Sequence, residues 1–265
     1  MKYEKKFIKD LSKYWNYILY QAKAELKVEI INSYLGWIWL FLEPLCFMLI
    51  YTFIAGTIFG SRMPYFPIFV FAGLTIWNFF NKTVTASIKI VNKNKEIITK
   101  VYVPKFVLLI VTIFVNLFKM LISFGLLLVF MSFYQVPISF NIFYVIPVLI
   151  GLILITFGIS SICMHFGVFM EDLVNLTNII LKFVFYLSGI FYDIPSKVPK
   201  PYNHILLNCN PVAFLITNLR NCLIYQSGIN IVVLLIWMGI GLCLSIVGIR
   251  TIYKHENTYV KVMKG

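Results

Sequence analysis

The sequence predicts an all-α integral membrane protein with six transmembrane helices, on the basis of its composition, its apolar runs and its charge distribution. Of the 265 residues, 60% are hydrophobic and only 12% are charged, whereas soluble domains carry roughly 25% charged residues. Several apolar runs exceed the ~20 residues that a helix needs to cross a hydrocarbon layer of ~30 Å. We therefore expect six spans, with both termini on the same side of the membrane.

The net charge of +13 is distributed unevenly along the chain. Seven lysines lie in residues 1–34, five lie in residues 89–105 and four basic residues follow Gly248, which makes sixteen of the 23. Lys and Arg concentrate on the cytoplasmic side of membrane proteins, so we assign these segments and both termini to the cytoplasm. A nucleic-acid-binding surface does not alternate with spans, so we expect no nucleic-acid partner.

The apolar pattern of residues 1–34 predicts an amphipathic helix that lies along the cytoplasmic membrane surface. Apolar residues recur at spacings of three and four, and most lysines lie off this stripe. Such a helix places its lysines near anionic headgroups, so membrane lipids are expected partners. The stripe consists of Ile8, Leu11, Trp15, Ile18, Ala22, Leu26 and Ile30.

The six spans are expected at about 35–59, 66–88, 106–133, 140–169, 173–192 and 229–253. Glu43 falls inside the first span, where a carboxylate normally faces protein or water and marks a functional site. The alternative is that Glu43 reaches the inner interface and that Pro44 only kinks the helix. In the second span, Trp77 and Phe80 alternate with amides, which indicates either a polar pathway or ordinary packing.

The chain is organised around a basic segment, residues 89–105, between the second and third spans. We expect a short helix over 92–102, ended by Pro104, which lacks a backbone donor. This segment is either a docking site for a cytoplasmic partner or a solvated turn that only sets topology.

The segment before the last span, residues 193–228, is too polar to cross but contains two short apolar pieces. They predict a pair of re-entrant half-helices at the outer face, broken at Asn210–Pro211. Cys209 and Cys222 both lie in this outer hairpin, and we expect no disulfide between them. Residues 254–265 form a basic cytoplasmic tail.

The sequence contains no recognisable catalytic or metal site. It has no GxxxxGK[ST] phosphate loop, no CxxC and no HExxH, so neither ATP binding by that route nor a common zinc site is expected. His165, His204 and His255 fall in three turns on two sides of the membrane. Secondary transport would favour an internal repeat and midplane acids, yet no repeat is visible and Glu43 is the one acid within a span. The remaining possibility is a pore driven by a separate motor.

Six stretches together resemble the permease subunits of type-2 ABC exporters for polysaccharide, O-antigen, capsule and teichoic acid. The resemblance covers essentially the whole chain in the right order and leaves the substrate open. The stretches are EIINSYLGWIWLFLEPL (29–45), FAGLTIWNFF (71–80), NKEIITKVYVPK (94–105), SGIFYD (188–193), NPVAFLITNLR (210–220) and ENTYVKVM (256–263).

The resemblance implies a homodimer paired with two copies of an ATP-binding-cassette ATPase, in a bacterial plasma membrane. ATP and Mg²⁺ would bind the ATPase, so we expect neither a cofactor nor enzyme activity in this chain. A lipid-linked glycan would leave through a pore along the dimer axis. By similarity, Asn94, Glu96, Lys100 and Pro104 couple to the ATPase, while Glu43, Trp77, Phe80, Tyr186 and Tyr192 line the substrate path.

One turn departs from the family pattern. Where relatives usually read Phe-Arg-Asp, this chain has Met170, Glu171 and Asp172, so we carry over only Asp172 as a coupling residue. The main alternative is a type-2 ABC permease for a drug or a small lipid. A secondary transporter, or a membrane protein without a motor, is less consistent with the six stretches.

Overall fold

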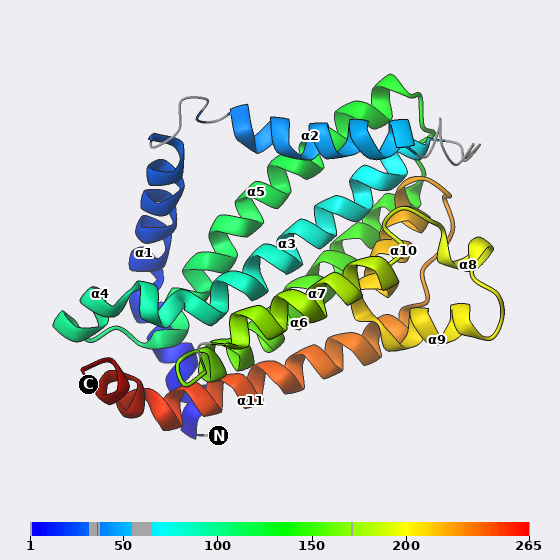
Figure 1. Cartoon of the computed structure of the whole chain (residues 1–265). Helices are drawn as coiled ribbons and strands as arrows, with labels where there is room; N and C mark the ends of the chain where they lie inside the picture. The colour runs from blue at the N-terminus through cyan, green and yellow to red at the C-terminus, as the bar shows by residue number, and fades with distance from the viewer. Residues whose placement is uncertain (1, 32–35, 37, 55–64, 171, 265) are drawn as a thin grey trace.

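The computed structural model describes residues 2–31, 36, 38–54, 65–170 and 172–264, and every regular element in these ranges is a helix. Both termini and the short helix α4 lie at one end of the molecule, which we call the inner end (Figure 1). Helices α8 and α9 lie at the opposite, outer end. The elements are α1 (Lys2–Ile31), α2 (Ile38–Phe53), α3 (Phe66–Lys93), α4 (Lys95–Lys100), α5 (Lys105–Phe133), the 3₁₀ helix η2 (Phe140–Tyr144), α6 (Val145–Gly167), α7 (Leu173–Leu187), α8 (Ile194–Lys197), α9 (Tyr202–Cys209), α10 (Pro211–Leu223) and α11 (Ile231–Lys264).

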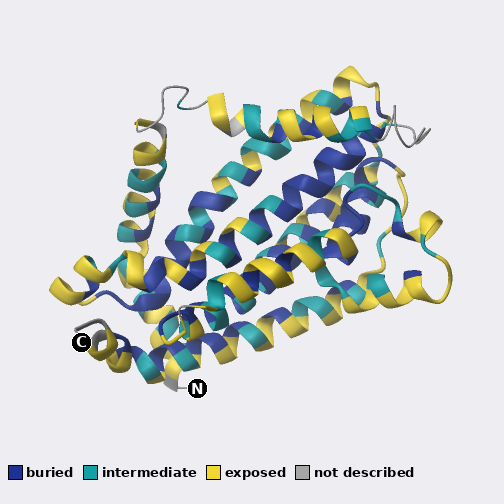
Figure 2. Ribbon diagram, viewed as in Figure 1, coloured by how far each residue is buried: buried dark blue, intermediate teal, exposed yellow. Residues whose placement is uncertain are grey.

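Helix α3 is the centre of the bundle. It contacts α2, α5, α6, α7 and α10, and its middle is almost entirely buried (Figure 2). Thr83 of α3 accepts a hydrogen bond from the amide of Asn116 in α5, at 3.0 Å. Most of α3 is therefore enclosed by other helices, and its exposed positions, which include Lys82, lie in its second half.

Helices α6 and α11 form the most extensive contact, and small residues bring their backbones together. A Cβ added to Gly248 would meet the Oγ atom of Ser161, and one added to Gly158 would lie 3.0 Å from the carbonyl oxygen of Gly241. Membrane helices associate through close packing of this kind, because lipid supplies no hydrophobic driving force between them.

Among the described residues, three helical stretches are long and apolar enough to cross a membrane: 105–133, 140–167 and 231–259. They lie in the ranges of the third, fourth and sixth expected spans. Two shorter apolar helical stretches, 41–53 and 173–187, lie in the ranges of the first and fifth. Residues 32–35, 37 and 55–64, which hold both ends of the first expected span and the outer turn after it, are outside the described ranges.

Three expectations about local structure need correction. The helix expected over 92–102 is only α4, since α3 continues to Lys93 and α4 ends at Lys100. Pro104 therefore precedes α5 instead of ending α4, a position that suits a residue without an N–H donor. The outer segment holds three helices rather than two, and α10 is a buried helix packed against α3 and α6.

Candidate functional site

The inner end exposes the middle of the basic segment. Glu96 and Lys100 of α4 are exposed, as are Val101 and Tyr102 directly after it, whereas Asn94 is half-buried. Pro104 is buried at the start of α5. An exposed apolar pair beside charged residues is a surface suited to a protein partner.

A buried ion pair holds the base of this segment in place. Nζ of Lys105 lies 3.7 Å from the carboxylate of Glu256 in α11, and both side chains are almost fully enclosed. The hydroxyl of Tyr102 donates to the same carboxylate at 3.2 Å. Two of the stretches behind the family resemblance, 94–105 and 256–263, therefore contact each other directly.

Helix α1 contacts the same region through α11. The hydroxyl of Tyr253 donates to Asp10 at 2.8 Å, and Nε of Arg250 donates to Glu4 at 2.7 Å. These contacts join the start of α1 to the end of α11. The long helices on either side of the basic segment are thus tied into one unit.

The turn between α6 and α7 lies at the same end. His165 in the last turn of α6 contacts the Tyr259 hydroxyl at 2.7 Å, and Asp172 just before α7 is exposed. A cavity lined by Lys89 and Lys93 of α3 also borders Gly167 and Val174. The structure therefore places Asp172 and the segment 89–105 at one end of the bundle, while Glu171 is outside the described residues.

At the outer end, three of the family-like stretches meet around Arg220. Its guanidinium donates to the carbonyl oxygens of Phe69, Gly189 and Ile190 at 3.0, 2.7 and 2.8 Å. The side chain is 2% exposed and stacks on the Phe69 ring, 3.4 Å from its centroid. The lack of a side chain at Gly73 provides the space for the guanidinium, because a Cβ there would lie 2.7 Å from Nη2 of Arg220.

Asn210 completes this outer cluster. Its Oδ1 accepts from the backbone N–H groups of Val212 and Ala213, which caps α10. Its Nδ2 donates to the Ser188 hydroxyl at 3.1 Å. Gly189 adopts a left-handed backbone with φ of +64°, a conformation that glycine accepts without strain. The sequence-based reasoning placed the break at Asn210–Pro211 but missed Arg220 as its anchor.

Four of the five residues expected in the substrate path belong to one aromatic group. The Trp77 ring packs on Phe80 and on Phe185, with centroids 6.1 and 5.2 Å apart, and the Tyr192 hydroxyl donates to the Tyr186 carbonyl at 2.8 Å. Trp77 and Phe80 are buried, whereas Tyr186 is 67% exposed. Within this chain, Tyr186 is thus the most accessible aromatic of the four.

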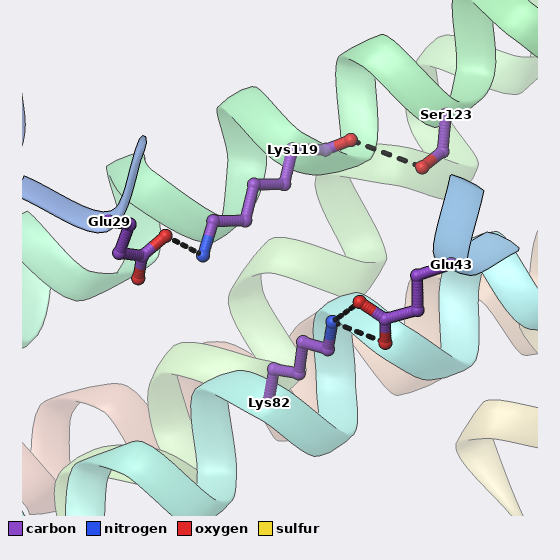
Figure 3. A network of polar contacts seen from close by, with 5 residues as sticks. All are labelled: Glu29, Glu43, Lys82, Lys119 and Ser123. Atoms are coloured by element: carbon purple, nitrogen blue, oxygen red, sulfur yellow. Dashed lines mark hydrogen bonds and ion pairs between the residues drawn. The ribbon is translucent and has the colours of Figure 1, made fainter. Parts of the chain in front are cut away.

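Glu43 lies elsewhere, in an ion pair with Lys82. Nζ of Lys82 contacts both carboxylate oxygens of Glu43 at 2.8 and 2.9 Å. A second pair joins Lys119 of α5 to Glu29 of α1 at 2.5 Å (Figure 3). Both lysines fall within apolar runs, and neither pairing was predicted, because the partners are 39 and 90 residues apart in the sequence.

Helix α7 presents a polar stripe that the sequence-based reasoning also missed. Asn175, Asn178, Lys182 and Tyr186 are all exposed and follow one another at spacings of three and four. Residues so spaced share one face of a helix. Polar side chains on an apolar helix face water or protein rather than lipid, so this face points toward a water-filled path or another chain.

The described residues form a helical bundle with long apolar helices and a basic inner end, which is typical of a multi-pass membrane protein. Residues 20–224 match the ABC-2 type transporter family, so the chain belongs to this family and is a multi-pass protein of the inner membrane. Such proteins are membrane subunits rather than catalytic ones, and they partner with an ATP-binding-cassette subunit.

Two relatives extend this assignment. The chain is 26% identical over 264 residues to an O-antigen export system permease protein RfbA of Klebsiella pneumoniae, which covers 99% of this chain and 98% of the relative. It is 27% identical over 214 residues to an O-antigen export system permease protein RfbA of Myxococcus xanthus, which covers 80% of this chain and 82% of that protein.

Proposed function

We propose that this chain is the permease of an ATP-driven exporter that moves a lipid-linked polysaccharide of the O-antigen type out of the cytoplasm. The observation that carries the proposal is the similarity to two O-antigen export permeases, over 99% and 80% of this chain. The absence of a phosphate loop in the sequence supports placing ATP and Mg²⁺ on a separate ATPase subunit, so this chain itself needs no cofactor.

The inner end of each permease copy is the proposed docking site for one ATPase copy, so a homodimer would bind two. Its surface combines the exposed residues Glu96, Lys100 and Asp172 with the exposed apolar pair Val101 and Tyr102. The buried pair between Lys105 and Glu256 ties this surface to α11. A push on α4 is therefore transmitted to a long helix rather than absorbed by a loose loop. Asn94 directly precedes α4 and Pro104 directly precedes α5, so these two residues position the exposed stretch between them rather than touching the partner.

A homodimer of six-span subunits is the proposed assembly, with the pore between the copies. The polar face of α7 supports this arrangement, because its exposed amides and lysine need a water-filled path. Tyr186 on the same face supplies a ring on which sugars stack. Tyr192 holds the backbone of Tyr186, while Trp77 and Phe80 support α7 from behind.

The experiment is deletion of this chain, complemented by variants in its own host. We expect the deletion to accumulate lipid-linked polymer on the inner face of the membrane, and the wild-type chain to restore export. Replacement of residues 94–100 by a Gly/Ser linker should abolish export while the protein still reaches the membrane. Undiminished export by the linker variant would contradict the proposal, and accumulation of a drug or a small lipid instead of polymer would favour a different substrate.

A further inference from the structure

Two adjoining cavities lie among α1, α2, α3 and α5, and both are lined by Lys82, Asn116 and Lys119. The larger, of about 250 Å³, also borders Glu29 and reaches Lys93 and Asn94 at the end of α3. The smaller, of about 40 Å³, borders Glu43 and the amide of Asn78. Together they form a polar recess inside a bundle that is otherwise apolar.

The two lysines that line both cavities, Lys82 and Lys119, are held by carboxylates that come from other helices. Lys82 and Glu43 are each 42% exposed, while Lys119 is 22% and Glu29 52% exposed. Figure 3 shows each carboxylate pointing at its lysine, one from the end of α1 and one from the start of α2. Charged residues within a span normally pair with one another, and the partial exposure of both pairs leaves each lysine accessible from the cavities that it lines.

A lysine ammonium that borders a cavity can also bind a phosphate group, provided that the phosphate displaces the paired carboxylate. Lysine binds phosphate as a point charge, and the two oxygens of Glu43 at 2.8 and 2.9 Å occupy the positions that two phosphate oxygens would take. The amide of Asn78 borders the same space and offers neutral donors. The carboxylates thus neutralise the lysines until a stronger anion displaces them.

We propose that this recess binds the phosphate or diphosphate head group of the lipid-linked substrate, with Lys82 and Lys119 exchanging Glu43 and Glu29 for phosphate oxygens. The inference rests on the proposed function, since it assumes a lipid-linked substrate. Typical small-molecule pockets measure ~300–1,000 Å³, so a cavity of about 250 Å³ takes a head group and not a sugar chain. The glycan itself follows another route.

The position of the recess connects the head group to the ATPase surface. Asn94 lines the larger cavity and is also the residue between α3 and α4. Its Nδ2 donates to the carbonyl oxygen of Ile90 at 2.8 Å. A bound head group would therefore lie against Asn94, directly before α4. By displacing Glu29 and Glu43 it would also break the ion pairs that join α1 to α5 and α2 to α3.

The test is binding of farnesyl diphosphate to the full-length chain, purified in detergent together with its co-purifying partners. Farnesol is the probe for the lipid part alone and inorganic pyrophosphate the probe for the free anion. We expect saturable binding of farnesyl diphosphate, competition by pyrophosphate and no competition by farnesol. Competition by farnesol with no effect of pyrophosphate would show that the lipid part alone binds, and would overturn the proposal.

Neutral double variants separate a ligand from a structural ion pair. Glu43→Gln/Lys82→Met and Glu29→Gln/Lys119→Met remove both charges of a pair, which leaves no orphaned charge. We expect at least a tenfold loss of affinity for farnesyl diphosphate in each, with unchanged thermal unfolding. Lys197→Met, at the exposed outer end, is the matched control and should bind as the wild type does.

Glu43→Gln alone gives the sharpest result. It removes the competing carboxylate and leaves Lys82 free, so we expect affinity to rise severalfold. A fall in affinity, or wild-type affinity in both double variants, would overturn the proposal. If binding is unaffected in these variants while ATPase co-purification and glycan export persist, only the head-group site is wrong. If neither partner nor export is found with the wild-type chain, the proposed function is wrong.

Discussion

Two regions of the bundle, the Arg220 cluster at the outer end and the recess of Lys82 and Lys119, place cations inside the protein in opposite ways. At the outer end, Arg220 is fully buried and binds three backbone carbonyls, with no carboxylate among the partners described for it. In the inner half, Lys82 and Lys119 are partly exposed, line a cavity and are paired with carboxylates from other helices. The partners of Arg220 are backbone carbonyls, which are fixed in place. The partners of the lysines are side chains, which can rotate away.

This difference indicates different roles. A guanidinium presents a rigid fork of donors, which suits a fixed joint between helices. An ammonium on a flexible stem adapts to a changing partner and is bound by a single carboxylate or phosphate. We therefore interpret the Arg220 cluster as a structural joint and the inner lysines as an exchangeable binding site. Three predictions test this contrast, in order of decreasing effect on stability.

The largest effect is expected for Arg220→Met. Three buried carbonyls would lose a charged donor, each hydrogen bond being worth ~1–3 kcal/mol, so we expect a loss of ~3 kcal/mol or more in the free energy of unfolding. Arg220→Lys should recover only part of this loss, because lysine lacks the fork. Thermal unfolding in detergent and the yield from membranes measure the effect. Arg250→Met, which breaks an exposed pair with Glu4, is the control and should leave the unfolding midpoint close to that of the wild type.

An intermediate effect is expected for Lys105→Met. It leaves the enclosed Glu256 carboxylate with the Tyr102 hydroxyl as its described partner, so we expect destabilisation of ~2 kcal/mol. Lys105→Met/Glu256→Gln removes both charges and should return to near wild-type unfolding, measured by the same thermal assay. A double variant that is less stable than Lys105→Met would show that Glu256 is held by something other than this pair.

The smallest effect is expected for Glu43→Gln. The pair with Lys82 is half-exposed, and such pairs contribute ~0–1 kcal/mol, so the unfolding midpoint should stay within the range of the Arg250→Met control. A loss as large as that of Arg220→Met would remove the contrast between the two regions and make Glu43–Lys82 a structural joint as well.

The sequence predicted the class of the fold more completely than the pairings within it. Helical periodicity and apolar runs are local properties, so the ranges of the longest helices followed from the residues alone. The bounds of α4 did not follow from the sequence, because α3 continues as a helix through Lys93. The buried face of α3 extends only to Val91, so its apolar pattern ends before the helix does. A regular helix through the tail to Lys264 was likewise not anticipated from its basic composition.

The candidate site was harder to predict because its contacts join distant residues. Lys105 and Glu256 are 151 residues apart in the sequence. Arg220 binds backbone carbonyls, which every residue carries, so no oppositely charged residue in the sequence indicates its partners. The polar stripe of α7 was readable, since Asn175, Asn178 and Lys182 recur at helical spacing. Each of these residues alone resembles an isolated polar position in an apolar run, so the stripe is visible only when the three are considered together.

The central claim, that a separate ATPase docks on the inner end of this permease, is tested most directly by affinity purification. The tagged full-length chain would be isolated from gently solubilised native membranes and its partners quantified by mass spectrometry. Glu96→Ala/Lys100→Ala would be compared with Lys197→Ala/Lys200→Ala, which removes two exposed lysines at the outer end. We predict an ATP-binding-cassette ATPase at one copy per permease with the wild-type chain and the outer variant, and strong depletion with the inner variant. Equal recovery with both variants, or no ATPase with any of them after cross-linking, would contradict the account.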